Sequence, residues 1–175
     1  MKLSRFLAEL GSRKGAPGGG AAAALVAATG AALVEMTARL NDKRLKHCSG
    51  NAAKAAELRV RLFGLIAKDT AAFQKIQKNY SERKKKPALW QDALKTGVQP
   101  PLSICENSAE AARLAKKEAP RTSAWLESDR REALILLRAA FDSAKLNVDI
   151  NLKSIQNRTF VRAAQRKTKK WRSSL

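Results

Sequence analysis

Aromatic residues are scarce in this chain: Phe, Trp and Tyr together make up 5% of its 175 residues. Apolar residues still reach 45%, which excludes the low-hydrophobicity composition of a disordered chain. Alanine is very common, and a core of small side chains with few rings suits closely packed helices. The length is most simply that of a single domain that can bury a substantial core.

Acidic residues are few as well. The chain has 15 of them against 35 basic residues, which gives a net charge of +20. This charge predicts attraction to polyanions such as nucleic acid, an acidic lipid surface or a polyacidic small molecule. A role in solubility is the simpler alternative, because net charge says nothing about the fold.

Cysteine and histidine are nearly absent. Cys48 and Cys105 lie far apart and form no Cys-x-x-Cys pair, which favours reduced thiols in an intracellular compartment. The single histidine, His47, would need several carboxylates to form a metal site, and none cluster beside it in the sequence. We therefore expect no metal site, a cytoplasmic protein, and His47 at the surface.

The chain also lacks an apolar run long enough to span a membrane. The run at residues 21–34 is shorter than a spanning helix requires, and most of it is alanine. It follows a Pro-Gly-Gly-Gly segment rather than the short basic head of a signal peptide. We expect a soluble protein with no membrane partner.

Glycine, by contrast, is concentrated at one place, in the segment Gly15-Ala16-Pro17-Gly18-Gly19-Gly20. Pro17 and three consecutive glycines are incompatible with a helix interior, whereas the alanines that follow favour a helix. The exposed N–H groups at such a helix start can bind an anion or a developing negative charge. A tight turn that only needs positive φ is the alternative.

Helical periodicity accounts for most of the chain, and no segment shows the sustained alternation of a strand. The expected helices cover residues 3–10, 21 to about 40, 52–80, 87–97, 102–118 and a final long stretch from 128. We expect connections at 41–51 and 120–127, and an interruption at Pro100-Pro101. The prediction is an all-α fold: a single-domain bundle of long antiparallel helices around a central alanine-rich helix.

The alanine-rich helix has two apolar faces, as expected of a helix in the centre of a bundle. The face with larger side chains contains Leu25, Thr29, Leu33, Met36 and Leu40. The second face consists of small residues that allow close approach of another backbone, namely Gly20, Ala24, Ala28 and Ala31.

Two acidic residues stand out. Asp69 lies four residues from both Leu65 and Phe73, on the apolar stripe of the helix at 52–80. Burial of an unpaired carboxylate is costly, so Asp69 is either a partnered structural residue or a functional one. Ser128-Asp129 has the residue types of a helix cap at the start of the last long helix.

Two amides and a basic C-terminus complete the candidates. Asn147 and Asn151 share a helix face and either line a pocket or are solvated. Residues 150–175 contain eight basic residues and no acidic residue. We therefore divide the chain into a helical domain at 1–157 and a basic tail at 158–175. Residues 158–172 of the tail are a candidate contact for nucleic acid, and a solvated terminus is the alternative.

Several short motifs, in order, resemble the cyclodeaminase/cyclohydrolase family. This family includes the domain of formiminotransferase-cyclodeaminase and the free-standing methenyltetrahydrofolate cyclohydrolases. The motifs are Pro17-Gly18-Gly19-Gly20-Ala21-Ala22-Ala23-Ala24-Leu25, Asp69-Thr70-Ala71-Ala72-Phe73, Ala93-Leu94 with Pro101-Leu102, Ser128-Asp129, and Asn147-Val148-Asp149-Ile150-Asn151-Leu152. Each motif alone is weak, but their order and spacing over about residues 3–160 are specific.

The resemblance implies a folate one-carbon substrate, no metal or other cofactor beyond the tetrahydrofolate, and a homodimer. The expected reaction is hydrolysis of methenyltetrahydrofolate to formyltetrahydrofolate, or cyclodeamination of formiminotetrahydrofolate. On this basis, Asp69 or Asp129 is expected to supply a catalytic carboxylate. The residues expected to bind substrate are Gly18, Gly19 and Gly20 through backbone amides, Asn147 and Asn151 at the pterin edge, and Arg44 and Lys46 at the glutamate tail.

A second interpretation starts from differences between this chain and the family pattern. Ala21 stands where the family usually has Ser, and the segment 40–47 retains only the basic Arg44 and Lys46 of the family's usual connection. Together with the charge and the basic tail, these differences suggest the alternative of an inactive relative that binds RNA or a ribonucleoprotein.

Overall fold

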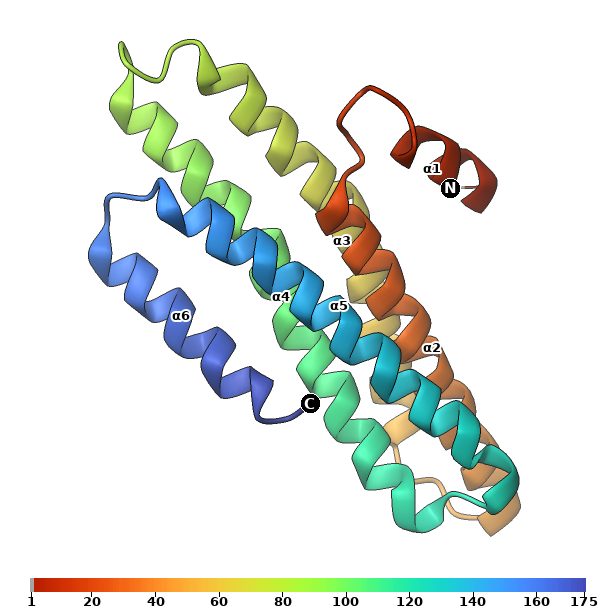
Figure 1. Ribbon diagram of the computed structural model, residues 1–175. Helices are drawn as coiled ribbons and strands as arrows, with labels where there is room; N and C mark the ends of the chain where they lie inside the picture. Colours follow the sequence, from red (N-terminus) through yellow and green to blue (C-terminus); the bar gives the residue numbers. More distant parts are fainter. Residues whose placement is uncertain (1) are drawn as a thin grey trace.

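The computed structural model describes residues 2–175, and within them every regular element is a helix (Figure 1). The α-helices are α1 (Leu3–Leu10), α2 (Gly19–Leu45), α3 (Asn51–Tyr80), α4 (Pro87–Glu118), α5 (Glu127–Lys153) and α6 (Arg158–Arg172). Two short 3₁₀ helices, η1 (Ala119–Arg121) and η2 (Ala124–Leu126), connect α4 to α5. The prediction of an all-α fold is therefore confirmed.

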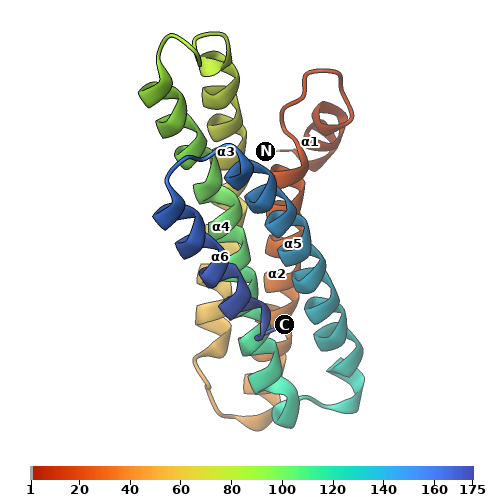
Figure 2. The same ribbon diagram turned by 60° about the vertical axis from the view of Figure 1, so that its left-hand side comes forward.

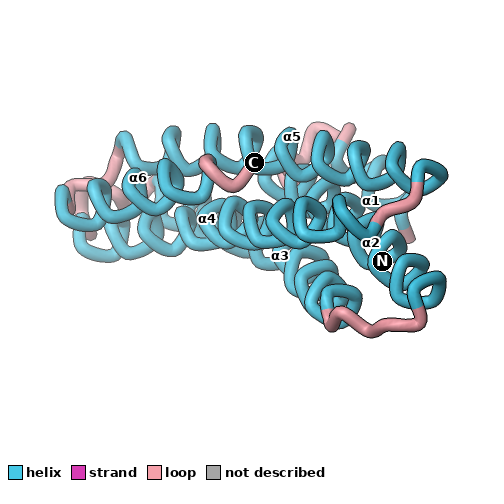
Figure 3. Tube along the Cα trace, turned by 90° about the horizontal axis from the view of Figure 1, so that it is seen from below, coloured by secondary structure: helices cyan, strands magenta, loops and turns pink. Residues whose placement is uncertain are grey.

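The helices α2, α3, α4 and α5 form an elongated antiparallel bundle (Figures 1 and 2). The short α1 lies beside the N-terminal end of α2, and α6 packs along α4 at the other side of the bundle (Figures 2 and 3). The segment predicted as a basic tail thus contains a helix, which buries Val161, Ala164 and Thr168. Its N-cap is Asn157, whose side chain accepts a hydrogen bond from the Phe160 N–H.

The central position of α2 follows from its small residues. Ala24, Ala27 and Ala31 are fully buried, because side chains of this size let α3, α4 and α5 approach the α2 backbone. The face with larger side chains is only partly covered, and Met36 is 36% exposed. In residues 2–175, α2 is also the one helix long and apolar enough to cross a membrane, and 56% of its most apolar window is buried inside the bundle.

The prediction that Pro100 and Pro101 interrupt a helix is wrong, because α4 continues through both of them. Proline lacks the N–H that would bond to the carbonyl four residues earlier. For Pro101 this carbonyl belongs to Gly97, and the side-chain Nδ2 of Asn151 donates to it instead at 3.0 Å. A neighbouring helix thus replaces the missing hydrogen bond.

Two helix boundaries, the end of α2 and the start of α5, also differ from the prediction. Residues 41–45, expected in a connection, form the last turns of α2. The helix α5 begins at Glu127 with Leu126 as N-cap, so Ser128 and Asp129 lie inside its first turn and no side chain caps it. The expected cap at Ser128-Asp129 is therefore wrong, since the 3₁₀ turn of η2 leads directly into α5.

Candidate functional site

A cavity of about 260 Å³ opens where α2 begins, between the middle of α3, the middle of α4 and the C-terminal part of α5. Its walls include six residues expected at the site from sequence, namely Gly18, Gly19, Gly20, Asp69, Asn147 and Asn151. Residues from four distant parts of the sequence thus meet at one end of the bundle. The antiparallel order of the helices produces this meeting, because α2 starts where α5 ends (Figure 1).

Residues 15–20, which we call the glycine loop, contribute backbone atoms to the cavity wall. Gly18 is the N-cap of α2, and no side chain caps this helix. The first N–H groups of an α-helix have no acceptor within the helix, so those of Gly19 and Gly20 are open to a ligand. A Cβ atom at Gly20 would overlap the Asp69 carboxylate, so glycine at this position lets the loop touch Asp69.

Asp69 is a half-buried carboxylate without an ionic partner. No Lys, Arg or His side chain within residues 2–175 forms an ion pair with it. Loss of water on burial raises the pKa of Asp69 above its usual range, and the backbone N–H of Ala21 acts in the opposite direction. A carboxylate in this state is the kind that functional sites contain.

The two asparagines use their amide nitrogens on backbone carbonyls. Asn151 Nδ2 donates to the Gly97 carbonyl at 3.0 Å, and Asn147 Nδ2 donates to the Ser143 carbonyl at 3.3 Å. Nδ2 of Asn147 also lies 4.0 Å from the position of a Cβ atom at Gly19, so this side chain borders the glycine loop. Both amides are partly exposed and line the cavity. Of the two alternatives from sequence, a pocket lining or a solvated face, the structure therefore agrees with the pocket lining.

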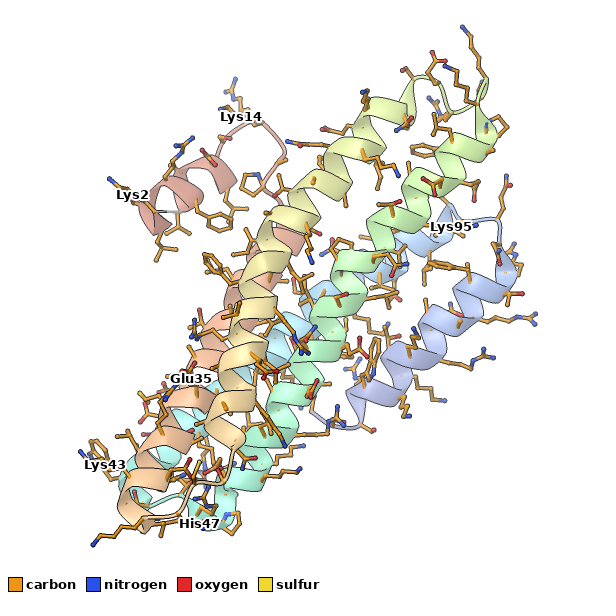
Figure 4. The ribbon with its side chains drawn as sticks, turned by 180° about the vertical axis from the view of Figure 1, so that it is seen from behind. Lys2, Lys14, Glu35, Lys43, His47 and Lys95 are labelled. Carbon is orange, nitrogen blue, oxygen red and sulfur yellow. The ribbon has the colours of Figure 1, made fainter. Side chains whose placement is uncertain are left out.

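The remaining predicted site residues lie elsewhere in the same chain. Asp129 is in the first turn of α5, about 27 Å along the helix axis from Asn147 at 1.5 Å of rise per residue. Arg44 and Lys46 are exposed at the C-terminal end of α2, about 37 Å from Gly19 by the same measure. Figure 4 shows their neighbours Lys43 and His47 together at this far end, away from Lys14 near the glycine loop. His47 is exposed, as predicted.

Sequence reasoning missed several lining residues, of which Thr70, Phe73, Ile76, Gly97 and Ile150 are the main ones. Thr70 and Phe73 lie one and four residues after Asp69 in the same short motif. This spacing was the signal in the sequence that could have placed them beside Asp69 in the cavity. Gly97 had no such signal, because its carbonyl lacks a helical donor only if α4 continues through Pro101, which the sequence did not predict.

The arrangement suits chemistry on a cationic or hydrogen-bond-donating ligand. It offers a carboxylate, two side-chain amides and the free N–H groups of a helix start within one cavity. The carboxylate can accept a proton and stabilise positive charge, and the N–H groups can stabilise an oxygen that gains negative charge. No group of three or more His, Cys, Asp or Glu side chains in the described part of the chain is placed to hold a metal ion.

Comparison with known proteins identifies relatives of this chain. A family model described as formiminotransferase-cyclodeaminase matches residues 2–170. A methenyltetrahydrofolate cyclohydrolase from Methylorubrum extorquens is 34% identical over 171 residues, which cover 90% of this chain and 82% of that protein. The formimidoyltransferase-cyclodeaminase of Rattus norvegicus is 30% identical over 171 residues, and the match spans only 32% of that longer enzyme.

A solved structure gives the same result in three dimensions. The crystal structure of formiminotetrahydrofolate cyclodeaminase from Thermotoga maritima superposes with a TM-score of 0.90 at 30% sequence identity, covering 99% of this chain and 89% of that one. None of these relatives is named for RNA binding, so they give no support to an inactive RNA-binding relative. With a family match over nearly its whole length, the chain belongs to the formiminotransferase-cyclodeaminase family.

Proposed function

We propose that this protein is a folate one-carbon enzyme that hydrolyses methenyltetrahydrofolate to formyltetrahydrofolate. The observation that carries the proposal is the unpaired, partly desolvated carboxylate of Asp69 against the open start of α2. The relative from Methylorubrum extorquens, matched over most of its length, is named for this activity.

In this proposal Asp69 acts as the general base. It takes a proton from the water that adds to the cationic methenyl carbon, which gives a tetrahedral carbon bonded to two nitrogens and a hydroxyl group. Asp69 then returns that proton to the nitrogen whose C–N bond breaks, and the hydroxyl proton passes to solvent as the formyl C=O forms. The ionised carboxylate also stabilises the substrate cation, and the amides of Gly18, Gly19 and Gly20 approach the reacting oxygen.

Cyclodeamination of formiminotetrahydrofolate is the second candidate reaction. The Thermotoga maritima and Rattus norvegicus relatives are named for this chemistry. It also passes through a tetrahedral carbon that carries nitrogen, with ammonia as the leaving group, so the same residues would serve both reactions. We propose that neither needs a metal or redox cofactor, because proton transfer and charge stabilisation are the tasks required.

The glutamate tail of the folate needs a separate argument. Arg44 and Lys46 are too far from Asp69 to contact the same ligand within one chain. We propose a homodimer in which the partly exposed stripe of α2 packs antiparallel on its copy. The stripe contains Ala22, Leu25, Val26, Leu33, Met36 and Leu40. A two-fold axis near the middle of the stripe would bring Arg44 of the partner subunit near the glycine loop.

The dimer is tested by sedimentation of the wild-type protein and of Leu33→Lys. We expect the variant to be monomeric and helical, with a raised KM for polyglutamylated substrate. A wild-type monomer that is fully active would contradict the dimer and the assignment of Arg44 and Lys46 to the glutamate tail.

The positive charge of α6 suggests a further binding partner. The exposed side of α6 is basic, and within residues 2–175 Arg172 is its one basic side chain that forms an ion pair, with Asp142 at 3.5 Å. We propose that α6 contacts polyanions such as nucleic acid, and that the protein works in the cytoplasm away from membranes. Nucleic-acid binding that weakens steeply with salt, and less so in a variant with neutral α6 side chains, is the expected result.

The decisive measurement is the loss of methenyltetrahydrofolate absorbance with purified protein, corrected for the spontaneous rate. We expect catalysed loss that disappears in Asp69→Asn and persists in Asp92→Asn, a control in which the altered side chain is 63% exposed. Release of ammonia from formiminotetrahydrofolate distinguishes the second reaction. A folded protein that accelerates neither reaction would contradict the proposed function.

A further inference from the structure

Asn151 is unusual among the cavity residues because its amide nitrogen donates a hydrogen bond to a backbone carbonyl inside another helix. Its Nδ2 donates to the carbonyl of Gly97, in the middle of α4. A mid-helix carbonyl normally accepts the N–H from four residues later, but that residue is Pro101, which has none. The Gly97 carbonyl is therefore open to a donor from outside the helix.

Gly97 allows this contact sterically. A Cβ atom at position 97 would overlap Ile76 and would lie 3.8 Å from Asn151 Nδ2. With hydrogen in its place, α3, α4 and α5 come together closely enough for the amide to reach the carbonyl. Both Gly97 and Asn151 line the cavity, so the bond forms part of its wall.

The bond also fixes which way the amide faces. A flipped amide would bring Oδ1 of Asn151 against the Gly97 carbonyl oxygen, and two acceptors in contact would leave both without a hydrogen bond. Oδ1 is therefore kept free of this contact and remains the side chain's only acceptor. Without Pro101, the N–H of residue 101 would supply a hydrogen bond to the Gly97 carbonyl, so this carbonyl would no longer depend on Asn151 and the energetic penalty for a flipped amide would fall.

We infer that Pro101 and Gly97 are positioning residues that hold Asn151 as a hydrogen-bond acceptor for an N–H group of the substrate. The inference rests on the proposed function for the identity of the substrate, and it specifies which edge of the ligand is read. The pyrimidine ring of a reduced folate carries an exocyclic amino group and a ring N–H, which are donors of the required kind. Asp69 and Oδ1 of Asn147 make the same part of the cavity rich in acceptors.

The structure provides a matched control for Pro101. Pro100 is the adjacent residue, is also buried in α4, and also lacks an N–H. The carbonyl that it leaves without a helical donor belongs to Thr96, which no side chain of α5 contacts through a hydrogen bond in residues 2–175. Pro100→Ala and Pro101→Ala thus make the same chemical change, and only the second one competes with Asn151.

The test compares the binding of tetrahydrofolate with that of its analogue lacking the 2-amino group. In the wild-type protein we expect the analogue to bind at least about 10-fold more weakly, because a buried acceptor loses its donor. Pro101→Ala and Asn151→Leu should reduce this discrimination to within about 3-fold, whereas Pro100→Ala should keep it. Equal discrimination by Pro101→Ala and Pro100→Ala would overturn the inference.

A second measurement needs no variant. Protein labelled with ¹⁵N in asparagine and ¹³C in the glycine carbonyl should show a through-hydrogen-bond coupling between Asn151 Nδ2 and the Gly97 carbonyl carbon. Absence of this coupling, with the Asn151 amide signals assigned, would overturn the inference even if Pro101→Ala fails to fold. A wild-type protein that binds no tetrahydrofolate would instead contradict the proposed function, so the two failures are distinguishable.

Discussion

The two ends of the bundle each contain a carboxylate that is removed from solvent, but their surroundings differ. At the end where α2 starts, Asp69 faces backbone and a cavity and has no ionic partner within residues 2–175. At the opposite end, Glu118 is fully buried at the C-terminus of α4. Its oxygens accept hydrogen bonds from Asn41 at 2.9 Å, Asn51 at 2.7 Å and Arg121 at 3.0 Å.

This difference separates a carboxylate held in a structural network from one that we propose is catalytic. The partners of Glu118 come from α2, α3 and η1, so one side chain ties together the loop and helix ends at that end of the bundle. Arg121 also pairs with Asp42 at 2.7 Å and extends the network. Burial alone therefore does not mark a candidate catalytic group; the proposal for Asp69 rests on its position beside a cavity without an ionic partner in residues 2–175.

The largest expected effect is that of Asp69→Asn. We expect turnover to fall by about 10² to 10⁴-fold, because an amide can neither accept the proton nor stabilise the cation. Stability near neutral pH should not fall, since the substitution removes a charge that burial disfavours. Steady-state kinetics and urea unfolding, with Asp92→Asn alongside, measure the two effects. A loss of stability equal to the loss of activity would make Asp69 a structural residue like Glu118.

Glu118→Ala should show the opposite pattern. We expect the free energy of unfolding to fall by about 3 to 5 kcal/mol, because Arg121 and the amides lose a buried partner. Turnover per folded molecule should change little, given the distance from the cavity. Urea unfolding at fixed protein concentration tests this, and Glu110→Ala, at an exposed position of the same helix, is the matched control. A stability change no larger than that of the control would remove the contrast between the two ends.

Gly20→Ala is expected to have an intermediate effect on both properties. The added methyl group would overlap the Asp69 carboxylate, so either the loop or the carboxylate must move. Overpacking of this kind costs about 1 to 3 kcal/mol of unfolding free energy. Turnover should fall by at least about 10-fold, since the carboxylate loses its position. Gly64→Ala, where a Cβ atom meets nothing within 4 Å, should leave turnover unchanged.

The smallest effect concerns pH. The pKa of Asp69 is higher in the folded protein than its ordinary value of 3.8, mainly through desolvation. The folded state therefore binds more protons than the unfolded state between these two pKa values, and stability falls as pH rises through that window. Activity should rise over the same window as the carboxylate ionises. The Asp69→Asn variant should lose both slopes in unfolding and rate profiles, and a wild-type rate that is flat across this range would argue against Asp69 as the base.

Much of the site could be predicted from sequence because its motifs are local. The glycine loop, Asp69 and the pair Asn147 and Asn151 each lie in a short motif, and antiparallel helices bring these motifs to one end of the bundle. Which end a residue occupies is harder to predict. Arg44 and Asp129 were also expected at the site, yet the lengths of α2 and α5 place both far from the cavity.

Two features of the fold could not be predicted because tertiary contacts override local rules. Pro100 and Pro101 break an isolated helix, and only the position of Asn151 on α5 explains why α4 tolerates the second of them. The second feature is which face of α2 is buried. Both of its faces are apolar, and the packing distance to α3 and α5 selects the face with the smaller residues.

The alanine face of α2 has a thermodynamic consequence. An alanine side chain has no rotamers to lose, so its burial carries almost no side-chain entropy cost, whereas Leu or Met would lose up to about 1 to 2 kcal/mol each at 25 °C. The area that each alanine removes from water is small, but close approach of the backbones adds dispersion contacts. The central helix of this bundle is therefore held in place with little side-chain ordering, which suits a core that contains few aromatic rings.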